Sequence, residues 1–184
     1  MRKLLYIFTV VAFFAFVSSS CKHSNREQRL AKVDTLSMAL NKVDSMLNIG
    51  INYDSITSRF NELKKYQEVL SPYILKFSQK EKSDYNQFMS SEKYYKTMIN
   101  VFDKYKTELE YSRTQVNNLK NDFDKKIIKK DKFDEYYNTE NKAVYKLLNN
   151  VKSDMFKSNK HHEKNIIFKP VLDSLTLKFA SKNK

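Results

Sequence analysis

The chain has 184 residues and a formal net charge of +13, from 34 lysine and arginine residues against 21 aspartate and glutamate residues. Its single glycine excludes a glycine-rich phosphate loop, a dinucleotide fingerprint and a Gly-x-Ser-x-Gly nucleophile elbow, and its single cysteine excludes an intramolecular disulfide. One glycine and two prolines are also too few for the tight hairpins of a sheet protein. We therefore predict an all-α fold.

The first residues have the order of a secretory signal. Two basic residues are followed by an apolar run over residues 4–17, by three serines, and then by Cys21, the only cysteine of the chain. The apolar run is shorter than the roughly 20 residues that a membrane-spanning helix needs. We therefore predict a cleaved signal peptide over residues 1–20.

The segment Ser18-Ser19-Ser20-Cys21 resembles the lipobox of bacterial lipoproteins, in the looser form that has serine three residues before the cysteine. The resemblance implies that a diacylglycerol is attached to the thiol of Cys21, that the chain is cut before this residue, and that the new amine takes a fatty acid such as palmitate. A thiolate is the nucleophile that this transfer needs, and each buried methylene of the lipid contributes about 0.8 kcal/mol to membrane binding. The alternative is a signal cut at another bond, with Cys21 left as a free thiol.

The same resemblance implies a location. It associates retention at the inner membrane with aspartate after the lipidated cysteine, and this chain has Lys22 there. We therefore expect a lipid-anchored protein of the cell envelope, at the outer membrane and facing the periplasm. Residues 21–26 are then a lipidated tether, and residues 27–184 are long enough for a single helical domain with its own core.

An apolar stripe at spacings of three and four predicts the first helix, over residues 27–48. We expect Gly50 to end this helix in a left-handed cap. The stripe consists of Val33, Leu36, Leu40, Val43 and Leu47.

A second stripe predicts a helix that starts near Asp54 or Ser55 and continues to Leu70. Ser71-Pro72 then breaks the chain and can restart a helix, with the serine as its N-cap and the proline in its first turn. Ser78 and Glu81 have the spacing of a capping box, which also marks a helix start. The sequence leaves open whether these signals start one helix or two.

The most regular pattern is a seven-residue apolar repeat, which predicts a coiled-coil-like seam. The repeat comprises Phe88, Tyr95, Phe102, Leu109, Val116 and Phe123. We expect Tyr85, Ile99 and Ile127 to form the second column of the seam, with charged residues between them. If residues 79–128 form one helix, it is about 75 Å long, and we expect it to be the backbone of an elongated antiparallel bundle.

Charged residues at 129–131 predict the turn to the next helix, because lysines suit a helix end and aspartate suits a helix start. Asn138-Thr139 is a candidate interruption of that helix, and residues 157–164 read as a polar connector. Pro170 is expected to kink or end the last helix. The apolar stripe of this half comprises Phe133, Tyr137, Val144, Leu148, Val151 and Met155.

His161-His162-Glu163 is the one cluster with several metal-ligating side chains. Adjacent helix residues point about 100° apart, and a metal site needs three or four convergent ligands. Carboxylates two residues apart, such as Glu108 and Glu110, also face different sides of a helix and have no partner that marks a general acid or base. We therefore expect no catalytic, cofactor-binding or metal site, and Cys21 as the one functional residue.

Three functions are compatible with these expectations. We expect a membrane-anchored envelope lipoprotein that acts as a non-enzymatic structural or protein-interaction module. The alternatives are an immunity- or exclusion-type inhibitor that binds a toxin or phage protein, and a surface adhesin for anionic polymers, which the basic excess favours. Besides the membrane, the expected partner is an envelope protein or an anionic polymer. Export separates the chain from nucleic acid, and the oligomeric state stays open.

Overall fold

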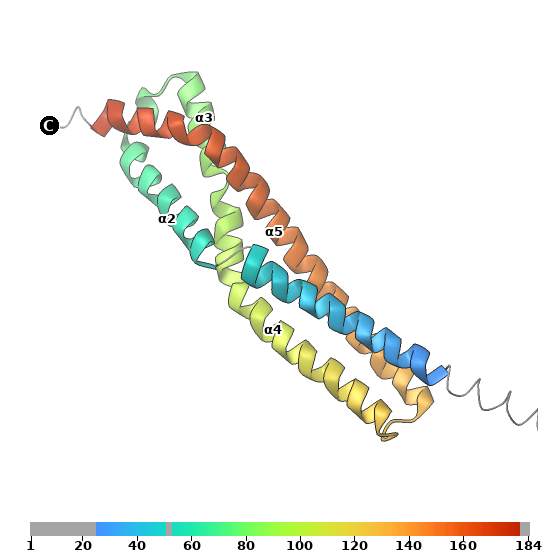
Figure 1. The fold of residues 1–184 in the computed structure, drawn as a ribbon. Coiled ribbons are helices and arrows are strands. Elements are labelled where there is room, and N and C mark those ends of the chain that lie inside the picture. Colours follow the sequence, from blue (N-terminus) through green and yellow to red (C-terminus); the bar gives the residue numbers. More distant parts are fainter. Residues whose placement is uncertain (1–24, 51–52, 181–184) are drawn as a thin grey trace, which may run out of the picture.

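The structure is a computed structural model that describes residues 25–50 and 53–180, and all regular elements in these ranges are helical. They form one elongated bundle (Figure 1), which confirms the predicted all-α fold. An N-terminal helix over residues 25–45 leads into the π-helical turn η1 (Met46–Gly50). The further elements are α2 (Tyr53–Leu70), the 3₁₀ helix η2 (Ser71–Lys76), α3 (Gln79–Met89), α4 (Glu92–Asp124) and α5 (Lys130–Ala180).

The helices make three legs that run along the bundle (Figure 1). The first leg is the N-terminal helix followed by α2, the second leg returns as α3 and α4, and the third leg is α5 alone. The first and third legs are parallel, because Arg29 pairs with Asp134 and Tyr66 with Asp173, at sequence separations of 105 and 107. This separation is kept on both sides of residues 51–52, so the N-terminal helix and α2 act as one leg.

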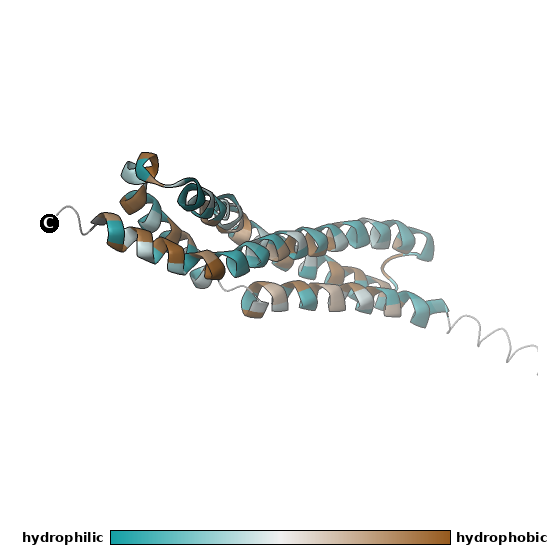
Figure 2. Cartoon of the chain, turned by 90° about the horizontal axis from the view of Figure 1, so that it is seen from above, coloured by the Kyte–Doolittle hydropathy of each residue, from teal (hydrophilic) through white to brown (hydrophobic). Residues whose placement is uncertain are grey.

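The predicted apolar stripes form the core of the bundle. The seven-residue column is confirmed, since none of its side chains is more than 5% exposed, and the stripe of the N-terminal helix is buried as well. Hydrophilic residues cover much of the outer faces of the helices (Figure 2). Phe102 packs on Tyr53 of α2 with ring centroids 5.1 Å apart, and Arg113 pairs with Asp44 at 2.9 Å. α4 therefore contacts the first leg on both sides of its interruption.

The second column of the seam differs from the prediction. Buried residues recur on the other side of the repeat, at Ser91, Met98, Tyr105, Ser112 and Leu119. In the predicted column, Tyr85 is buried in the core and Ile99 packs against it. The charged members of that column pair with the first leg: Glu92 with Lys64 and Lys120 with Asp34, at 2.5 and 2.6 Å. Ile127 is 68% exposed, so its assignment to the seam is wrong.

Two helix starts follow Leu70, which answers the question that the sequence left open. η2 contains Pro72 in its first turn, but its N-cap residue is Leu70, so the prediction of Ser71 as N-cap is wrong. Ser78 forms the predicted capping box, since its Oγ accepts from the Glu81 backbone N–H and its own N–H donates to the Glu81 carboxylate at 2.7 Å. Lys178 and then Ser78 lower the pKa of Glu81 to about 2, which ties the start of α3 to the end of α5.

The chain from 79 to 128 is not one helix. α3 ends at Met89, and α4 begins at Glu92 after the break at Ser90-Ser91. The turn after α4 comes earlier than predicted, at residues 125–129, and Lys126 takes a left-handed backbone conformation with φ 61°. α5 already begins at Lys130.

α5 is longer than the sequence predicts. It continues through Asn138-Thr139 and through residues 157–164, which are helix and not a connector, and it buries Ser158 and Asn165. Pro170 does not end it, although proline cannot donate the usual helical hydrogen bond. The axis of α5 changes direction in its last part (Figure 1), the bend that such a residue causes.

The N-terminal helix also ends differently from the prediction. Gly50 has no positive φ and lies in the wide turn η1, so it is no left-handed cap. An added Cβ at Gly50 would lie 2.7 Å from the Met155 Cε, so glycine permits a close approach to α5 here. α2 begins at Tyr53 and has Asp54 in its first turn. Within 25–50 and 53–180, no helix is both long and apolar enough to cross a membrane.

We predict that Phe102→Ala lowers the free energy of unfolding by about 3–5 kcal/mol, because the ring is buried in the middle of the column. Urea denaturation followed by circular dichroism measures the change. Tyr111→Ala on the same helix is the matched control, since its ring is 65% exposed and its loss should change stability by about 0.5 kcal/mol or less. Equal losses in both variants would mean that the column is not the core.

Candidate functional site

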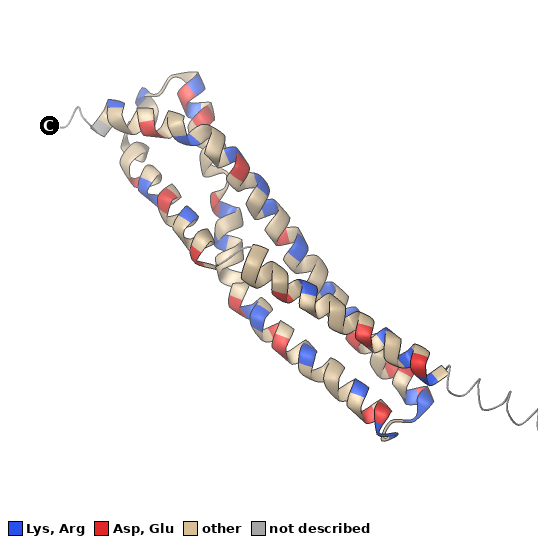
Figure 3. Cartoon of the chain, viewed as in Figure 1, with Lys and Arg blue, Asp and Glu red and all other residues tan. Residues whose placement is uncertain are grey.

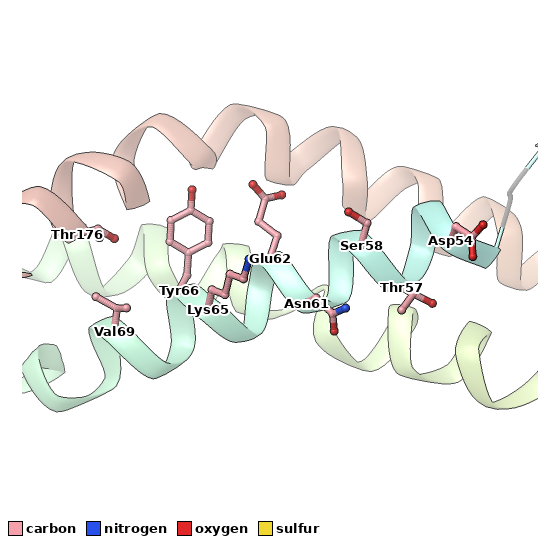
Figure 4. Close-up of a pocket in the computed structure, with 9 residues that line it drawn as sticks. All are labelled: Asp54, Thr57, Ser58, Asn61, Glu62, Lys65, Tyr66, Val69 and Thr176. Carbon is pink, nitrogen blue, oxygen red and sulfur yellow. The ribbon is translucent and has the colours of Figure 1, made fainter.

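An open groove of about 780 Å³ lies along α2, beside the C-terminal part of α5. In Figure 4, Ser58, Glu62 and Tyr66 point from α2 toward α5. All lining residues but one come from α2: Asp54, Thr57, Ser58, Asn61, Glu62, Lys65, Tyr66 and Val69, with Thr176 from α5. The groove thus lies in the half of the bundle that does not contain the N-terminal helix.

The groove follows one polar face of α2, which sequence reasoning missed because it followed the apolar stripe on the other face. The lining positions repeat at intervals of three and four residues, as one face of a helix requires. Thr57, Ser58 and Asn61 are short, so they leave room that longer side chains would fill. A run of short polar side chains on one helical face was therefore the available signal.

Four polar side chains connect α2 to α5 beside this groove. Glu62 forms an ion pair with Lys169, whose Nζ lies 3.4 Å from the Tyr66 hydroxyl, and Tyr66 donates to Asp173. Burial and the hydrogen bond to Asp173 raise the pKa of the Tyr66 phenol. The carboxylate of Glu62 raises the pKa of Lys169. Because these residues come alternately from the two helices, they fix the register of α2 against α5.

A buried polar cluster adjoins the groove, at the break between α3 and α4. Asn165 of α5 is 7% exposed, and its side-chain amide lies 2.7 Å from the Ser91 Oγ. In the orientation that satisfies both ends of the amide, its nitrogen donates to the carbonyl oxygens of Phe88 and His161, at 3.2 and 3.3 Å. The Tyr95 hydroxyl lies 3.5 Å away. The cluster therefore joins α5 to the end of α3, through the Phe88 carbonyl, and to the break itself, through the Ser91 hydroxyl.

The two histidines of α5 face different helices. The ring of His161 stacks on Tyr94 of α4, with centroids 3.9 Å apart, and its Nδ1 is buried with no hydrogen-bond partner in the described ranges. Burial, followed by the charges of three lysines, lowers the pKa of His161. Burial and the charge of Arg59 on α2 lower the pKa of His162. Both imidazoles therefore favour the neutral form, and they do not converge with Glu163 on one centre.

Residues 25–50 and 53–180 contain no group of three or more His, Cys, Asp or Glu side chains that could hold a metal ion. Of the two carboxylates that the sequence singled out, Glu110 pairs with Arg113. In the groove, Glu62 and Tyr66 are both engaged with α5. The groove thus offers short hydroxyl and amide groups, which suit hydrogen bonding to a bound segment better than proton transfer.

Comparison with models of known protein families, with curated proteins and with solved structures finds no match to this chain. Cys21, the predicted lipidation site, lies outside the described residues, together with the signal peptide and the start of the tether.

We predict that the free energy of unfolding falls as pH is lowered from 7 to 5, because of the two histidines. Their pKa values in the folded chain lie below the ordinary value of 6.5, so below that pH the unfolded chain takes up protons that the folded chain does not. Their stabilisation is thus complete above about 6.5 and is lost below it. Urea denaturation at both pH values measures the effect.

The double variant His161→Gln and His162→Gln isolates this contribution. Lys93, Lys160 and Lys164 face the first imidazole, and Arg59, Glu62 and Glu163 act on the second, and all of them stay in place. The loss of stability between pH 7 and 5 should be smaller in the double variant than in the wild-type chain. Equal losses would contradict a neutral histidine pair.

Proposed function

We propose that the protein is a lipoprotein of the bacterial cell envelope, anchored through Cys21 to the outer membrane on its periplasmic side. It acts there as a non-enzymatic structural or protein-interaction module. The groove along α2 is the surface that binds the partner, an envelope protein that offers an extended polar segment.

The observation that carries this proposal is the position of the groove relative to the start of the N-terminal helix. That helix begins beside the turn between α4 and α5, since Arg26 pairs with Asp124 at 2.5 Å. The groove lies along α2, in the other half of the bundle (Figure 1). α5 connects the two halves without interruption over 51 residues, about 75 Å of helix. Such a bundle would hold the groove away from a membrane to which its first helix is tethered.

Side-chain chemistry supports a binding role. Two titratable side chains that line the groove bind across the contact with α5: Glu62 pairs with Lys169, and Tyr66 donates to Asp173. Groups that are tied to a neighbouring helix fix the geometry of a surface. A general acid or base would instead have to face the space where a substrate binds.

Mass spectrometry of the protein purified from bacterial envelopes tests the anchor. The expected mass is that of residues 21–184 plus a diacylglycerol and one further acyl chain, with all of the added mass on the N-terminal residue. The Cys21→Ala chain, made in the same cells, should lack the lipid. An unmodified Cys21 sulfur, or a mature chain that starts at another residue, would contradict the proposed lipid anchor.

Photo-crosslinking in intact cells tests the groove. A photoreactive residue at Ser58, within the groove, should give a crosslinked product with an envelope protein. The same residue at Thr114, exposed on α4, is the matched control and should not give this product. An incoming toxin or phage protein as the only product would favour the inhibitor function. Identical products from both positions would show that the groove is not the binding surface.

A further inference from the structure

We propose that the turn between α4 and α5 is a second membrane contact, which binds the headgroups of anionic phospholipids beside the lipid anchor. The turn lies at the end of the bundle where the N-terminal helix begins (Figure 1). This inference rests on the proposed function, because only a chain tethered through Cys21 would hold this turn against a membrane.

The turn is an ordered helix ending. The Lys126 N–H donates to the Phe123 carbonyl at 3.1 Å, and the Ile127 N–H donates to the Asp122 carbonyl at 2.8 Å. With the left-handed backbone of Lys126, these bonds make a Schellman motif. Glycine is the usual residue at that position, so lysine there is retained at some conformational cost.

An apolar side chain at the tip of this turn faces solvent. In a Schellman motif the residue in the place of Ile127 normally packs on the last turn of the helix. Here the facing residues are Asn121 and Asp122, which are polar, and Ile127 is 68% exposed. The turn is a hydrophobic segment between two hydrophilic helices (Figure 2). An exposed isoleucine between lysines is suited to the boundary between lipid headgroups and acyl chains.

The charge of the turn favours an anionic surface. Basic residues lie on both sides of the isoleucines (Figure 3). They are Lys125, Lys126, Lys129 and Lys130, with one carboxylate, Asp131, next to them. Three neighbouring acids are paired: Asp124 binds Arg26, Asp134 binds Arg29 and Glu135 binds Lys132. Asp122 and Asp131 are the remaining carboxylates beside the four lysines, which leaves an excess of positive charge at the turn. These four lysines form no ion pair among the described residues, so their charge is available to lipid phosphates.

The tether keeps the turn close to the membrane. Arg26 binds both the backbone carbonyl and the carboxylate of Asp124, the last residue of α4. Arg26 is five residue steps from Cys21, and an extended chain of that length spans at most roughly 18 Å. Lipidation of Cys21 would therefore hold the turn within about two Debye lengths of the membrane surface, where basic residues begin to feel the charge of anionic lipids.

A groove of about 480 Å³ beside the turn adds a place for a single lipid. Leu119, Ile128 and Tyr136 give it apolar walls, and Lys129 and Lys132 lie at the same site. Asp122 and Glu140 also line it, and burial raises the pKa of Glu140 and so favours its neutral form. A glycerophospholipid has the matching chemistry, with a phosphate for Lys129 and an acyl chain for the apolar walls.

A fluorophore on the turn of the lipidated protein tests the proposal. The wild-type cysteine carries the lipid, so an introduced Asp131→Cys is the only free thiol, and it leaves every lysine and isoleucine of the turn in place. The protein is reconstituted into phosphatidylcholine vesicles with and without phosphatidylglycerol. We expect a blue shift and a several-fold gain in emission only with phosphatidylglycerol, and its loss at high salt. Leu75→Cys in η2, 91% exposed at the other end of the bundle, is the control and should not shift.

Two quadruple variants separate the turn from general basicity. Changing Lys125, Lys126, Lys129 and Lys130 to Gln should abolish the shift. Changing Lys142, Lys146, Lys152 and Lys160 of α5 to Gln removes the same charge elsewhere and should leave the shift intact.

A label that stays in water on both vesicles overturns the membrane contact and points to an acidic protein at the turn. An equal shift on both vesicles overturns the role of the lysines. A protein without lipid in the mass spectrum would instead mean that the proposed function fails.

Discussion

The unbroken third leg is the constraint on which the rest of the bundle depends. The other two legs are each interrupted once, near Gly50 in the first and at Ser90-Ser91 in the second, and the two breaks lie at different heights along α5. α5 supports both: Met155 lies against Gly50, and Asn165 binds the backbone at the second break. Because the breaks are staggered, each one is flanked by intact helix. The two breaks therefore do not divide the bundle into two separate parts.

Ion pairs flank the core and mainly determine register. Single exposed pairs contribute about 0–1 kcal/mol each, so they do not explain the stability of the bundle. Their positions are nevertheless ordered: Asp34, Asp44 and Lys64 of the first leg meet Lys120, Arg113 and Glu92 of the second leg in strict antiparallel sequence. A shift by one helical turn would break all three pairs and bring apolar column residues out of the core. Burial provides the energy, and the charges select one alignment.

Whether a feature of the fold could be predicted from the sequence depends on how far apart in the chain its interacting residues lie. The heptad column and the Ser78–Glu81 capping box were predictable, because periodicity and capping are local properties. The continuity of α5 through residues 157–164 was not. The segment looks polar, but Asn165 is buried against the break at Ser91, far away in the chain, where its amide meets the Ser91 hydroxyl and the Phe88 carbonyl. The second column is a similar case: the sequence shows Met98, Tyr105 and Leu119 beside the repeat, but their burial as its main partner column depends on which side the other helices occupy.

The candidate site could not be predicted from the sequence, because it also depends on residues that are far apart in the chain. The contact of α2 with α5 beside the groove is made by pairs such as Tyr66 with Asp173. These two residues are 107 positions apart, and no sequence motif connects them. Cys21 is the opposite case, because the lipobox pattern is contiguous and needs no fold to be seen. The sequence thus predicts the anchored end of the proposed lipoprotein, while the surface that would bind a partner becomes visible only in three dimensions.

The half of the bundle that holds the groove combines an apolar core with polar helix contacts. Its core is as closed as that of the other half, since Leu63, Phe88 and Leu172 are all buried. Beside this core, α2 meets α5 through side-chain hydrogen bonds such as that of Tyr66 to Asp173, and Asn165 of α5 meets Ser91 at the break in the second leg. Buried polar groups need such partners, so these contacts select one alignment of the helices. The groove lies along the face of α2 next to them, and the same contacts that align α2 with α5 therefore fix the geometry of the candidate binding surface.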